Sequence, residues 1–280
     1  MERKVAIVGA GISGLLACKY TLSRGYIPIV FEAESVLGGV WAKTTETTRV
    51  QSKKTIYQFS DFPWPDCVTN DHPTSKETIN YLHSYALDFD VLRHIKFNCK
   101  VLSMTYEGAS EDEMHAWSLW GGTGEPFNSR GKWNVVVQDT KSLSIEDYQF
   151  DFVILCVGRF SGIPNMPEFP QGKGPEVFKG QVIHSMDYSK MDDAEAAALV
   201  KGKRIAVVGL RKSAMDIALE CANANGAQPH ILTGLKLSSL CIPSTTVFLN
   251  EFNTFTVAAT INKMCMLTIE QCILRRTLSG

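Results

Sequence analysis

The stretch that decides the fold lies at the start of the chain, where residues 4–14 read KVAIVGAGISG. A short apolar run leads into three glycines, Gly9, Gly11 and Gly14, in the spacing G-x-G-x-x-G. In a strand–turn–helix unit the first glycine makes the tight turn, and the second lets the backbone approach a pyrophosphate. The third lets the helix pack on the strand. The stretch therefore predicts a dinucleotide-binding turn.

The residues after the glycines complete the same unit. A helical segment reading LLACKYTLS comes next, followed by a second strand, YIPIVFEA, which ends at Glu32. The other turn residues, Ala10, Ile12 and Ser13, bring backbone amides and the positive end of the helix toward the phosphates. Glu32 can accept hydrogen bonds from the ribose hydroxyls of an adenosine. Because strand, glycines, helix, strand and acid occur in order, a dinucleotide site is favoured over a purely structural unit.

The same pattern recurs 200 residues later, where residues 205–218 read IAVVGLRKSAMDIA. Gly209 matches Gly9, and Ala214 takes the place of Gly14. Two dinucleotide units in one chain indicate two nucleotides, one FAD and one nicotinamide. A second unit retained only for packing is the alternative.

The second turn differs from the first at its middle position, which Arg211 occupies. Arg211 and Lys212 can hold phosphates as point charges, although basic residues at a helix start are often only part of the surface. After the second strand, Thr233 stands where the first unit has Glu32, so no carboxylate there repels the 2′-phosphate of NADP. The candidate NADP-binding residues are Gly209, Leu210, Arg211, Lys212, Ser213 and Ala214.

Composition narrows the class of protein. The chain has 280 residues, 45% of them hydrophobic, and a formal net charge of −1, which indicates a folded globular protein and gives no support for nucleic acid as a partner. None of the eight cysteines forms a C-x-x-C pair or lies at zinc-ligand spacing, so free thiols, a cytoplasmic location and no metal are expected. No apolar stretch is long enough for a transmembrane segment, and the first strand leaves no room for a signal peptide.

Three further segments carry candidate site residues. Residues 38–41 read GGVW, in which Gly39 allows a close backbone approach to a flat ring system and Trp41 lays an aromatic ring nearby. Residues 57–65 read YQFSDFPWP and contain one acid, Asp61, which either orients groups near a flavin or caps a turn. Residues 178–188 read FKGQVIHSMDY, in which His184 is either a site residue or a satisfied structural histidine.

These segments together resemble the class B flavin-containing monooxygenases, and most closely the plant members. The resemblance rests on GAGISG, GGVW, SDFPWP, FKGQVIHSMDY and VVGLRKSAMDIA, and it extends from about residue 3 to about residue 230. One plant clade is similar in having a lysine-serine-alanine turn without the middle glycine, so the second turn resembles a clade variant. The resemblance implies an α/β fold with two Rossmann-like dinucleotide-binding domains.

The resemblance also implies the chemistry. NADPH would reduce FAD, and the reduced flavin would react with O2 to give a C4a-hydroperoxyflavin that oxygenates a soft nitrogen or sulfur of a small amine or thioether. FAD would contact Gly9, Ala10, Gly11, Ile12, Ser13, Gly14, Glu32, Gly39 and Trp41. The candidate catalytic residues are Gln51, Asp61 and His184. Gln51 occupies a position where many relatives have an asparagine.

The chain departs from the family mainly in its last part. Full members continue beyond residue 280 to complete the FAD domain, whereas residues 235–280 match no family motif. The expected organisation is an FAD domain over 1–160 without its usual C-terminal return, a partial NADP domain over 161–234 and a divergent tail. A shortened, inactive family member that at most binds FAD is the alternative function. A disulfide or ferredoxin reductase is disfavoured because the cysteines are unpaired.

Overall fold

A computed structural model describes most of the chain and divides it into two compact units. The described residues are 3–45, 47–108, 112, 115, 131–159, 162–164, 171–172, 174–209, 212–226, 230–232, 246–250 and 256–258. Unit 1 consists of Met1–Ala42 and Val50–Ser161, and unit 2 consists of Lys43–Arg49 and Gly162–Gly280. The short segment Lys43–Arg49 thus belongs to unit 2, although it lies inside the sequence range expected for the first domain.

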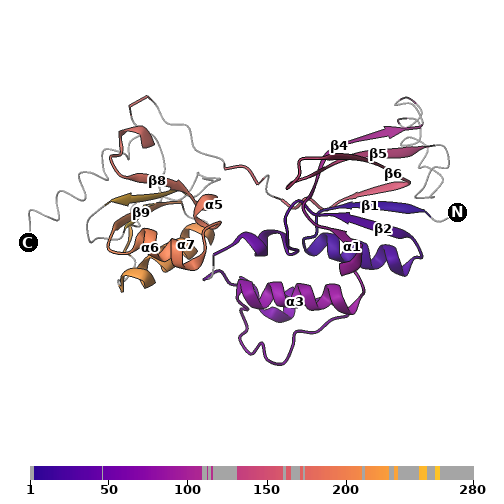
Figure 1. Ribbon diagram of the computed structural model, residues 1–280. Helices are drawn as coiled ribbons and strands as arrows, with labels where there is room; N and C mark the ends of the chain where they lie inside the picture. Colours follow the sequence, from indigo (N-terminus) through magenta and orange to yellow (C-terminus); the bar gives the residue numbers. More distant parts are fainter. Residues whose placement is uncertain are drawn as a thin grey trace, which may run out of the picture. The chain divides into compact units, whose positions relative to one another are not determined.

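Unit 1 is built on a parallel sheet that begins with the apolar strand of the first glycine turn (Figure 1). Its strands follow the order β3-β2-β1-β7, and every neighbouring pair is parallel. These strands are β1 Lys4–Val8, β2 Ile27–Phe31, β3 Ile95–Lys96 and β7 Phe152–Leu155. Helix α1, Ile12–Ser23, connects β1 to β2. Because parallel strands need such crossovers, this is the β–α–β unit that the glycine spacing predicts.

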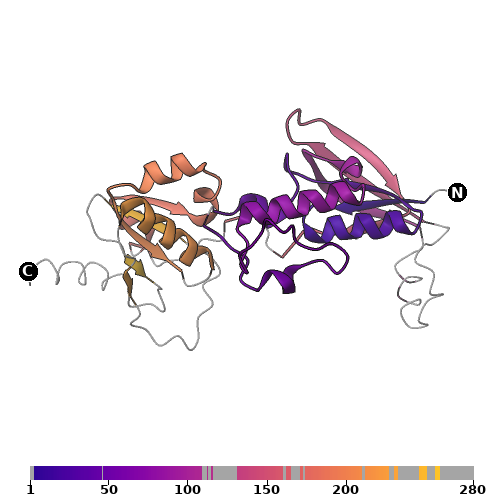
Figure 2. The same ribbon diagram turned by 90° about the horizontal axis from the view of Figure 1, so that it is seen from below.

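Helices cover one face of this sheet. Helix α3, Ser75–Asp88, lies beside α1 in both views (Figures 1 and 2) and begins with a capping box between Thr74 and Glu77. Further short helical segments are the 3-10 helices Gly39–Lys43, whose last residue falls in unit 2, and Leu92–His94, and helix α2, Lys54–Tyr57. Leu15 and Cys18 of α1 and Leu82 of α3 are fully buried in the resulting core.

A three-stranded antiparallel sheet covers the other face (Figure 1). Its strands are β4 Cys99–Glu107, β5 Lys132–Asp139 and β6 Ile145–Phe150. Val135 and Phe150 from this sheet pack with Ala6 and Phe31 from the parallel sheet. Unit 1 therefore has three layers, and its parallel sheet is buried on both faces, as such sheets generally are.

The aromatic segment 57–65 belongs to the core of unit 1. The Trp64 ring stacks on Tyr81 of α3 with 4.0 Å between ring centroids. The Tyr81 hydroxyl donates a hydrogen bond of 2.5 Å to the Phe62 carbonyl and accepts one of 2.9 Å from the Phe59 amide. These contacts fix the segment against α3, so its aromatic character serves packing.

Unit 2 has a five-stranded mixed sheet with the order β10-β12-β9-β11-β8. Its strands are β8 Gln181–His184, β9 Arg204–Val208, β10 His230–Leu232, β11 Thr246–Asn250 and β12 Thr256–Ala258. In unit 1 the strand after the turn helix pairs directly with the strand before it, but here β12 lies between β9 and β10 and is parallel to both. The segment 235–280 therefore contributes two strands to the sheet, and the sequence repeat does not extend to the strand order.

Helices of unit 2 pack on this sheet (Figures 1 and 2). They are α5 Ser185–Tyr188, α6 Asp193–Val200 and α7 Lys212–Asn225, with a 3-10 turn at Pro175–Val177. The Asp192 side chain caps α6 by accepting a 2.8 Å hydrogen bond from the Glu195 amide. Ile205 of β9 and Ile217 of α7 lie at the centre of a separate core.

The cysteines of the described regions are free thiols, as the sequence predicts. Burial raises the pKa of Cys18 and of Cys221 to about 12, so both behave as small core residues. Cys241, Cys265 and Cys272 lie outside the described residues. None of the described helices has the length and apolar character that crossing a bilayer requires.

Candidate functional site

Backbone contacts explain two of the three glycines in the first turn. Gly9 has a φ of 101° and donates a hydrogen bond of 2.8 Å to the Phe31 carbonyl. A Cβ atom on Gly9 would lie 2.6 Å from the carbonyl oxygen of Cys156 on the neighbouring strand end, and one on Gly14 would lie 1.8 Å from the Gly9 oxygen. Neither position has room for a side chain, because the turn is closed by its own backbone.

The GGVW loop packs directly on this turn. The Gly38 amide donates a 3.0 Å hydrogen bond to the Ala10 carbonyl. A Cβ atom on Gly39 would lie 3.1 Å from the Cα of Gly11. The structure thus joins two glycine segments that are separated in sequence into one surface of bare backbone, which is the surface that a pyrophosphate or a flat ring needs for close approach.

The start of α1 carries donors that no side chain satisfies. Gly11 is the N-cap residue and provides no side-chain cap, and no acidic residue lies in the first turn. Ile12 is half-buried and Ser13 is exposed. The first amides of a helix lack intrahelical acceptors. They therefore offer hydrogen bonds and positive potential to an anion at this end of α1.

Glu32 follows β2 and has a second contact that the sequence does not reveal. One carboxylate oxygen accepts a hydrogen bond of 2.7 Å from the Ala10 amide, and the other accepts one of 3.0 Å from the Glu34 amide. Glu32 is only 8% exposed. A carboxylate has about four acceptor positions, so Glu32 holds the glycine turn in place and retains capacity for ribose hydroxyls.

The remaining residues predicted for unit 1 have different surroundings. The Trp41 indole nitrogen donates a 2.5 Å hydrogen bond to the Tyr57 hydroxyl, with the two rings edge to face. Gln51 is exposed and has no hydrogen bond to any described residue. Asp61 forms an ion pair with Lys19, seven residues along α1 from Ile12. Seven residues are about 10 Å of helix, so the observed partner of Asp61 lies away from the turn.

The described residues on either side of the second turn repeat those of the first turn at an offset of 200 residues. Strand β9 ends at Val208, Gly209 has a φ of 147°, and α7 begins at Lys212. Ala214 is fully buried at the position of Gly14, and Ser213 is exposed like its counterpart in the first turn. Leu210 and Arg211 lie outside the described residues, so the contacts predicted for Arg211 stay a prediction.

Segment Lys43–Arg49 contains residues that bind helix α7, a contact that the sequence does not predict. The Thr48 hydroxyl donates a 2.7 Å hydrogen bond to the Asp216 carboxylate on α7, and both residues are buried. The Thr47 amide and hydroxyl both donate to Glu220, at 3.1 Å and 3.0 Å. Residues 43–49 read KTTETTR, a polar stretch without periodicity, and nothing in that pattern signals contact with a helix far along the chain.

His184 lies at the end of β8, where it caps α5. Its Nδ1 accepts a hydrogen bond of 3.2 Å from the Met186 amide. Its Nε2 is buried and has no partner among the described residues. Burial lowers the pKa of the imidazole below its ordinary value of 6.5, since burial outweighs the attraction of Asp187. His184 is therefore neutral in the folded protein at neutral pH.

The lowered pKa of His184 predicts how stability depends on pH. The unfolded chain takes up a proton on this side chain near pH 6.5, and the folded protein takes it up only at a lower pH. The free energy of unfolding should therefore decrease as the pH falls below 6.5, by at most about 1.4 kcal/mol per pH unit for one proton. Thermal denaturation between pH 5 and 8 should show a smaller decrease for His184→Gln.

The matched control is His83→Gln, because His83 is exposed on α3. That variant should retain the pH dependence of the unmodified chain. Equal slopes for His184→Gln and the unmodified chain would contradict the burial argument.

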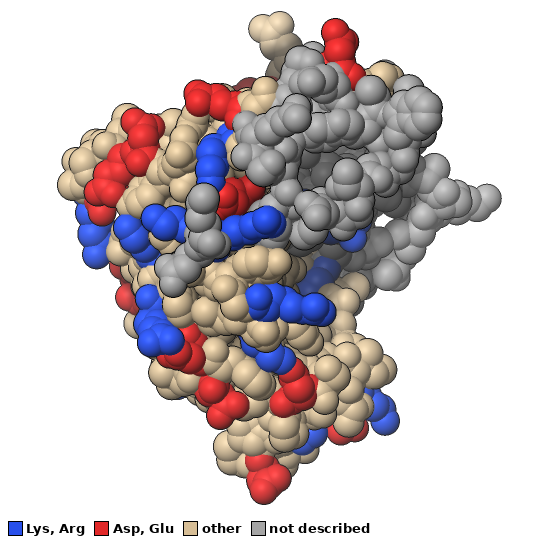
Figure 3. Space-filling view, turned by 90° about the vertical axis from the view of Figure 1, so that its right-hand side faces the viewer, with Lys and Arg blue, Asp and Glu red and all other residues tan. Residues whose placement is uncertain are grey.

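Other surface features lie apart from the two turns. On the face in Figure 3, Lys and Arg side chains are interspersed with Asp and Glu side chains, without a patch of one sign. The described residues include no group of three His, Cys, Asp or Glu side chains that could hold a metal.

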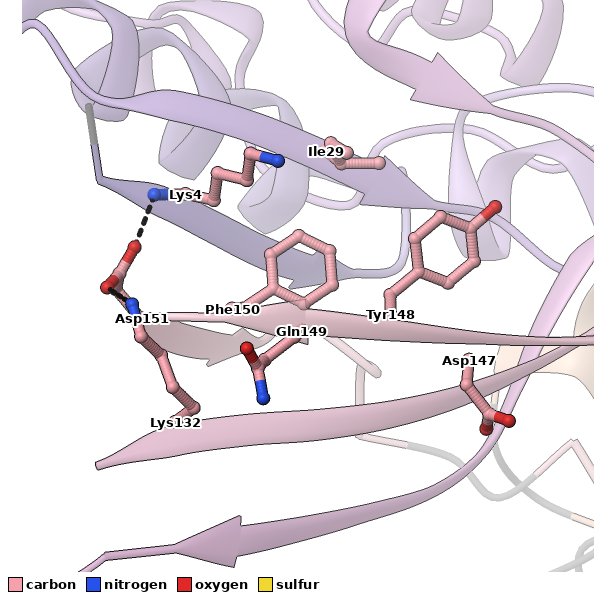
Figure 4. Close-up of a pocket in the computed structure, with 8 residues that line it drawn as sticks. All are labelled: Lys4, Ile29, Lys132, Asp147, Tyr148, Gln149, Phe150 and Asp151. Atoms are coloured by element: carbon pink, nitrogen blue, oxygen red, sulfur yellow. Dashed lines mark hydrogen bonds and ion pairs between the residues drawn. The ribbon is translucent and has the colours of Figure 1, made fainter. Parts of the chain in front are cut away.

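A hollow of about 390 Å³ lies between β1, β2 and the antiparallel sheet (Figure 4). Asp151 binds the Lys4 amide at 2.7 Å and pairs with Lys132 beside this hollow. Lys4 begins β1, whereas the glycine turn follows its other end. The hollow is therefore not part of the dinucleotide site.

Comparisons with known proteins agree with this geometry. A family model described as "FMO-like: Flavin-binding monooxygenase-like" matches residues 2–236. The chain is 44% identical over 226 residues to a probable flavin-containing monooxygenase 1 of Arabidopsis thaliana, a match that covers 79% of this chain and 42% of that protein. The chain thus spans less than half the length of this relative.

Two solved structures show the same fold. One is an S-allyl-L-cysteine S-oxygenase from Allium sativum, with a TM-score of 0.64 and 19% identity, covering 94% of this chain and 57% of that one. The other is an oxidized steroid monooxygenase bound to NADP, with a TM-score of 0.56 and 23% identity, covering 82% of this chain and 38% of that one. At these identities the likeness concerns the fold.

Proposed function

Because the chain belongs to the flavin-binding monooxygenase-like family, we propose that it is a flavin-dependent monooxygenase that uses FAD, NADPH and O2 to oxygenate a small molecule. The observation that carries the proposal is the first turn, where three separate segments meet around bare backbone. The Ala10 carbonyl accepts from Gly38, and the Ala10 amide donates to Glu32.

FAD fits this turn on the chemistry of the residues present. The uncapped amides at the start of α1 supply donors for the pyrophosphate, and the contact between Gly11 and Gly39 leaves room for close approach. Glu32 would bind the ribose hydroxyls with its free acceptor positions. Unit 1 is accordingly the proposed FAD unit, which corresponds to residues 1–160 of the sequence-based division.

NADPH is assigned to the second turn. Its strand, positive-φ glycine and helix start repeat those of the first turn, and a structure of similar fold is bound to NADP. The first turn of α7 contains no acidic side chain, and Asp216 in the second turn is paired with Lys212. Gly209, Ser213 and Ala214 would then lie against the pyrophosphate, and unit 2 would be the nicotinamide unit.

The protein's part in the reaction is binding, orientation and exclusion of water. When bound, FAD reduced by NADPH supplies the reaction with O2. Trp41, positioned by its hydrogen bond to Tyr57, would flank the flavin, and Gln51, Asp61 and His184 are retained as proposed catalytic positions. A soft nitrogen or sulfur of a small amine or thioether is the proposed site of oxygenation.

The absorption spectrum of the purified 280-residue chain tests this proposal first. Flavin bands near one equivalent per chain are expected, followed by oxidation of NADPH that consumes O2. A colourless protein that added FAD neither tints nor stabilises would contradict the assignment of the first turn. Bound flavin without any NADPH oxidation would contradict the monooxygenase activity while leaving the FAD site intact.

A further inference from the structure

The first basic residue of α7 is paired with a buried carboxylate. Lys212 begins α7, and its ammonium forms an ion pair with Asp216, one helical turn further on. The Lys212 side chain is 34% exposed and the Asp216 side chain 8% exposed. Among the described residues, Asp216 is the only ionic partner of Lys212. The carboxylate is therefore shielded from water, whereas the ammonium is partly exposed, so solvent screens the pair in part.

A residue from Lys43–Arg49 completes the environment of Asp216. One carboxylate oxygen of Asp216 pairs with Lys212, and the other accepts the Thr48 hydroxyl at 2.7 Å. The Thr48 hydroxyl lies 3.0 Å from that of Thr45, and because its single proton goes to Asp216, Thr45 is the donor of this second bond. The carboxylate is thus fixed by two partners and cannot turn away from Lys212.

This arrangement affects the charge at the start of α7. The Lys212 ammonium is bound by the carboxylate of Asp216, which lies one helical turn further along α7. Its charge is thus offset by a carboxylate of the same helix, which reduces the attraction that this end of α7 would have for a phosphate. Asp216 also places a negative charge near the end of the helix where positive potential attracts anions.

We propose that Asp216 is a positioning residue that weakens the affinity of the second turn for the phosphates of NADPH, by holding Lys212 in the pair supported by Thr48. The inference rests on the proposed assignment of NADPH to this turn. Lys212, read from the sequence as a phosphate ligand, is instead a counter-ion of Asp216. The affinity of the turn is then set by a carboxylate that does not touch the nucleotide.

Titration calorimetry with NADP⁺ on the full chain tests this inference. Asp216→Asn removes the negative charge, retains a group that can bind Thr48, and frees Lys212. It should bind NADP⁺ roughly three- to tenfold more tightly at low ionic strength. Its affinity should also fall more steeply with added salt, because a released cation contributes to binding.

The double variant Lys212→Gln, Asp216→Asn is the matched comparison. It shares the Asp216→Asn change with the single variant but lacks the cation, so its affinity for NADP⁺ and its salt dependence should return to those of the unmodified chain. If the double variant instead binds NADP⁺ at least tenfold more weakly than the unmodified chain, Lys212 is a direct phosphate ligand and the inference is overturned.

The outcomes separate the inference from the proposed function. Binding of NADP⁺ by the unmodified chain, with equal or weaker binding by Asp216→Asn, would overturn the inference and leave the nucleotide assignment standing. An absence of NADP⁺ binding in the unmodified chain and in Asp216→Asn would overturn the assignment itself, and the inference with it. The flavin spectrum of each variant should match that of the unmodified chain, which controls for the fold of unit 1.

Discussion

Replacing Gly14 by alanine is expected to weaken FAD binding severely. The added Cβ atom would lie 1.8 Å from the Gly9 oxygen and 3.6 Å from the Cβ of Cys156, so α1 must move away from the turn. Because the contact is with backbone, no side chain can rotate to relieve it. Overpacking of this severity costs about 3 kcal/mol or more, which corresponds to a loss of about 100-fold in affinity. Flavin content of the purified variant, measured by absorbance, should fall close to zero.

Gly25→Ala is the control for the Gly14 variant. Gly25 follows α1 in the same unit, and apart from its chain neighbours no atom lies within 4 Å of its ideal Cβ position. Its φ of 76° makes alanine strained there, at a cost of about 1 kcal/mol. This variant should keep its flavin. Retention of FAD by Gly14→Ala would mean that the turn opens more readily than its packing indicates.

The second large effect is expected for Glu32→Ala. The substitution removes both acceptors from the Ala10 and Glu34 amides. A hydrogen bond to a charged group contributes about 1.5–3 kcal/mol, so the free energy of unfolding of unit 1 should fall by about 3 kcal/mol. FAD affinity should decrease by about 100-fold, since the turn loses its anchor and the ribose its acceptor. Urea denaturation and FAD titration measure the two effects separately.

Two further variants separate charge from geometry at this position. Glu32→Gln retains one carbonyl acceptor and should lose less stability than Glu32→Ala. Glu34→Gln alters a neighbouring exposed carboxylate while keeping the amide that Glu32 binds, and it should resemble the unmodified chain. If Glu32→Ala weakened FAD binding without any loss of stability, the bond to Ala10 would contribute nothing to holding the turn.

Local sequence predicts the strand, turn and helix at the first turn well, because these elements follow one another directly along the chain. The clash that excludes a side chain at Gly14 is with Gly9 of the same turn, whereas the clash at Gly9 is with Cys156 on a strand far along the chain. The match between the two turns also follows from sequence, since β9 and α7 begin 200 residues after β1 and α1. Only one of the two roles of Glu32 at the end of β2 can be predicted from the sequence. Its ribose contact is predicted from the pattern, but its bond to Ala10 depends on how the turn folds back.

Contacts between distant segments could not be predicted in this way. The ion pair of Asp61 with Lys19 depends on the packing of the aromatic segment against α3. The bond from Thr48 to Asp216 joins residues 168 positions apart, and no sequence motif links the two. The position of β12 between β9 and β10 is likewise set by tertiary pairing. A single sequence carries no signal for such pairings.

The placement of Lys43–Arg49 limits how this protein can be divided or recombined. The backbone passes between the two units after Ala42, after Arg49 and after Ser161. A gene fragment that starts at Gly162 would omit Thr47 and Thr48, and Glu220 and Asp216 of α7 would lose the donors that these residues provide. A chimaera that exchanges the second unit with that of a relative must therefore bring this heptapeptide along, although it is encoded far upstream. No single cut in the chain therefore separates the two units completely.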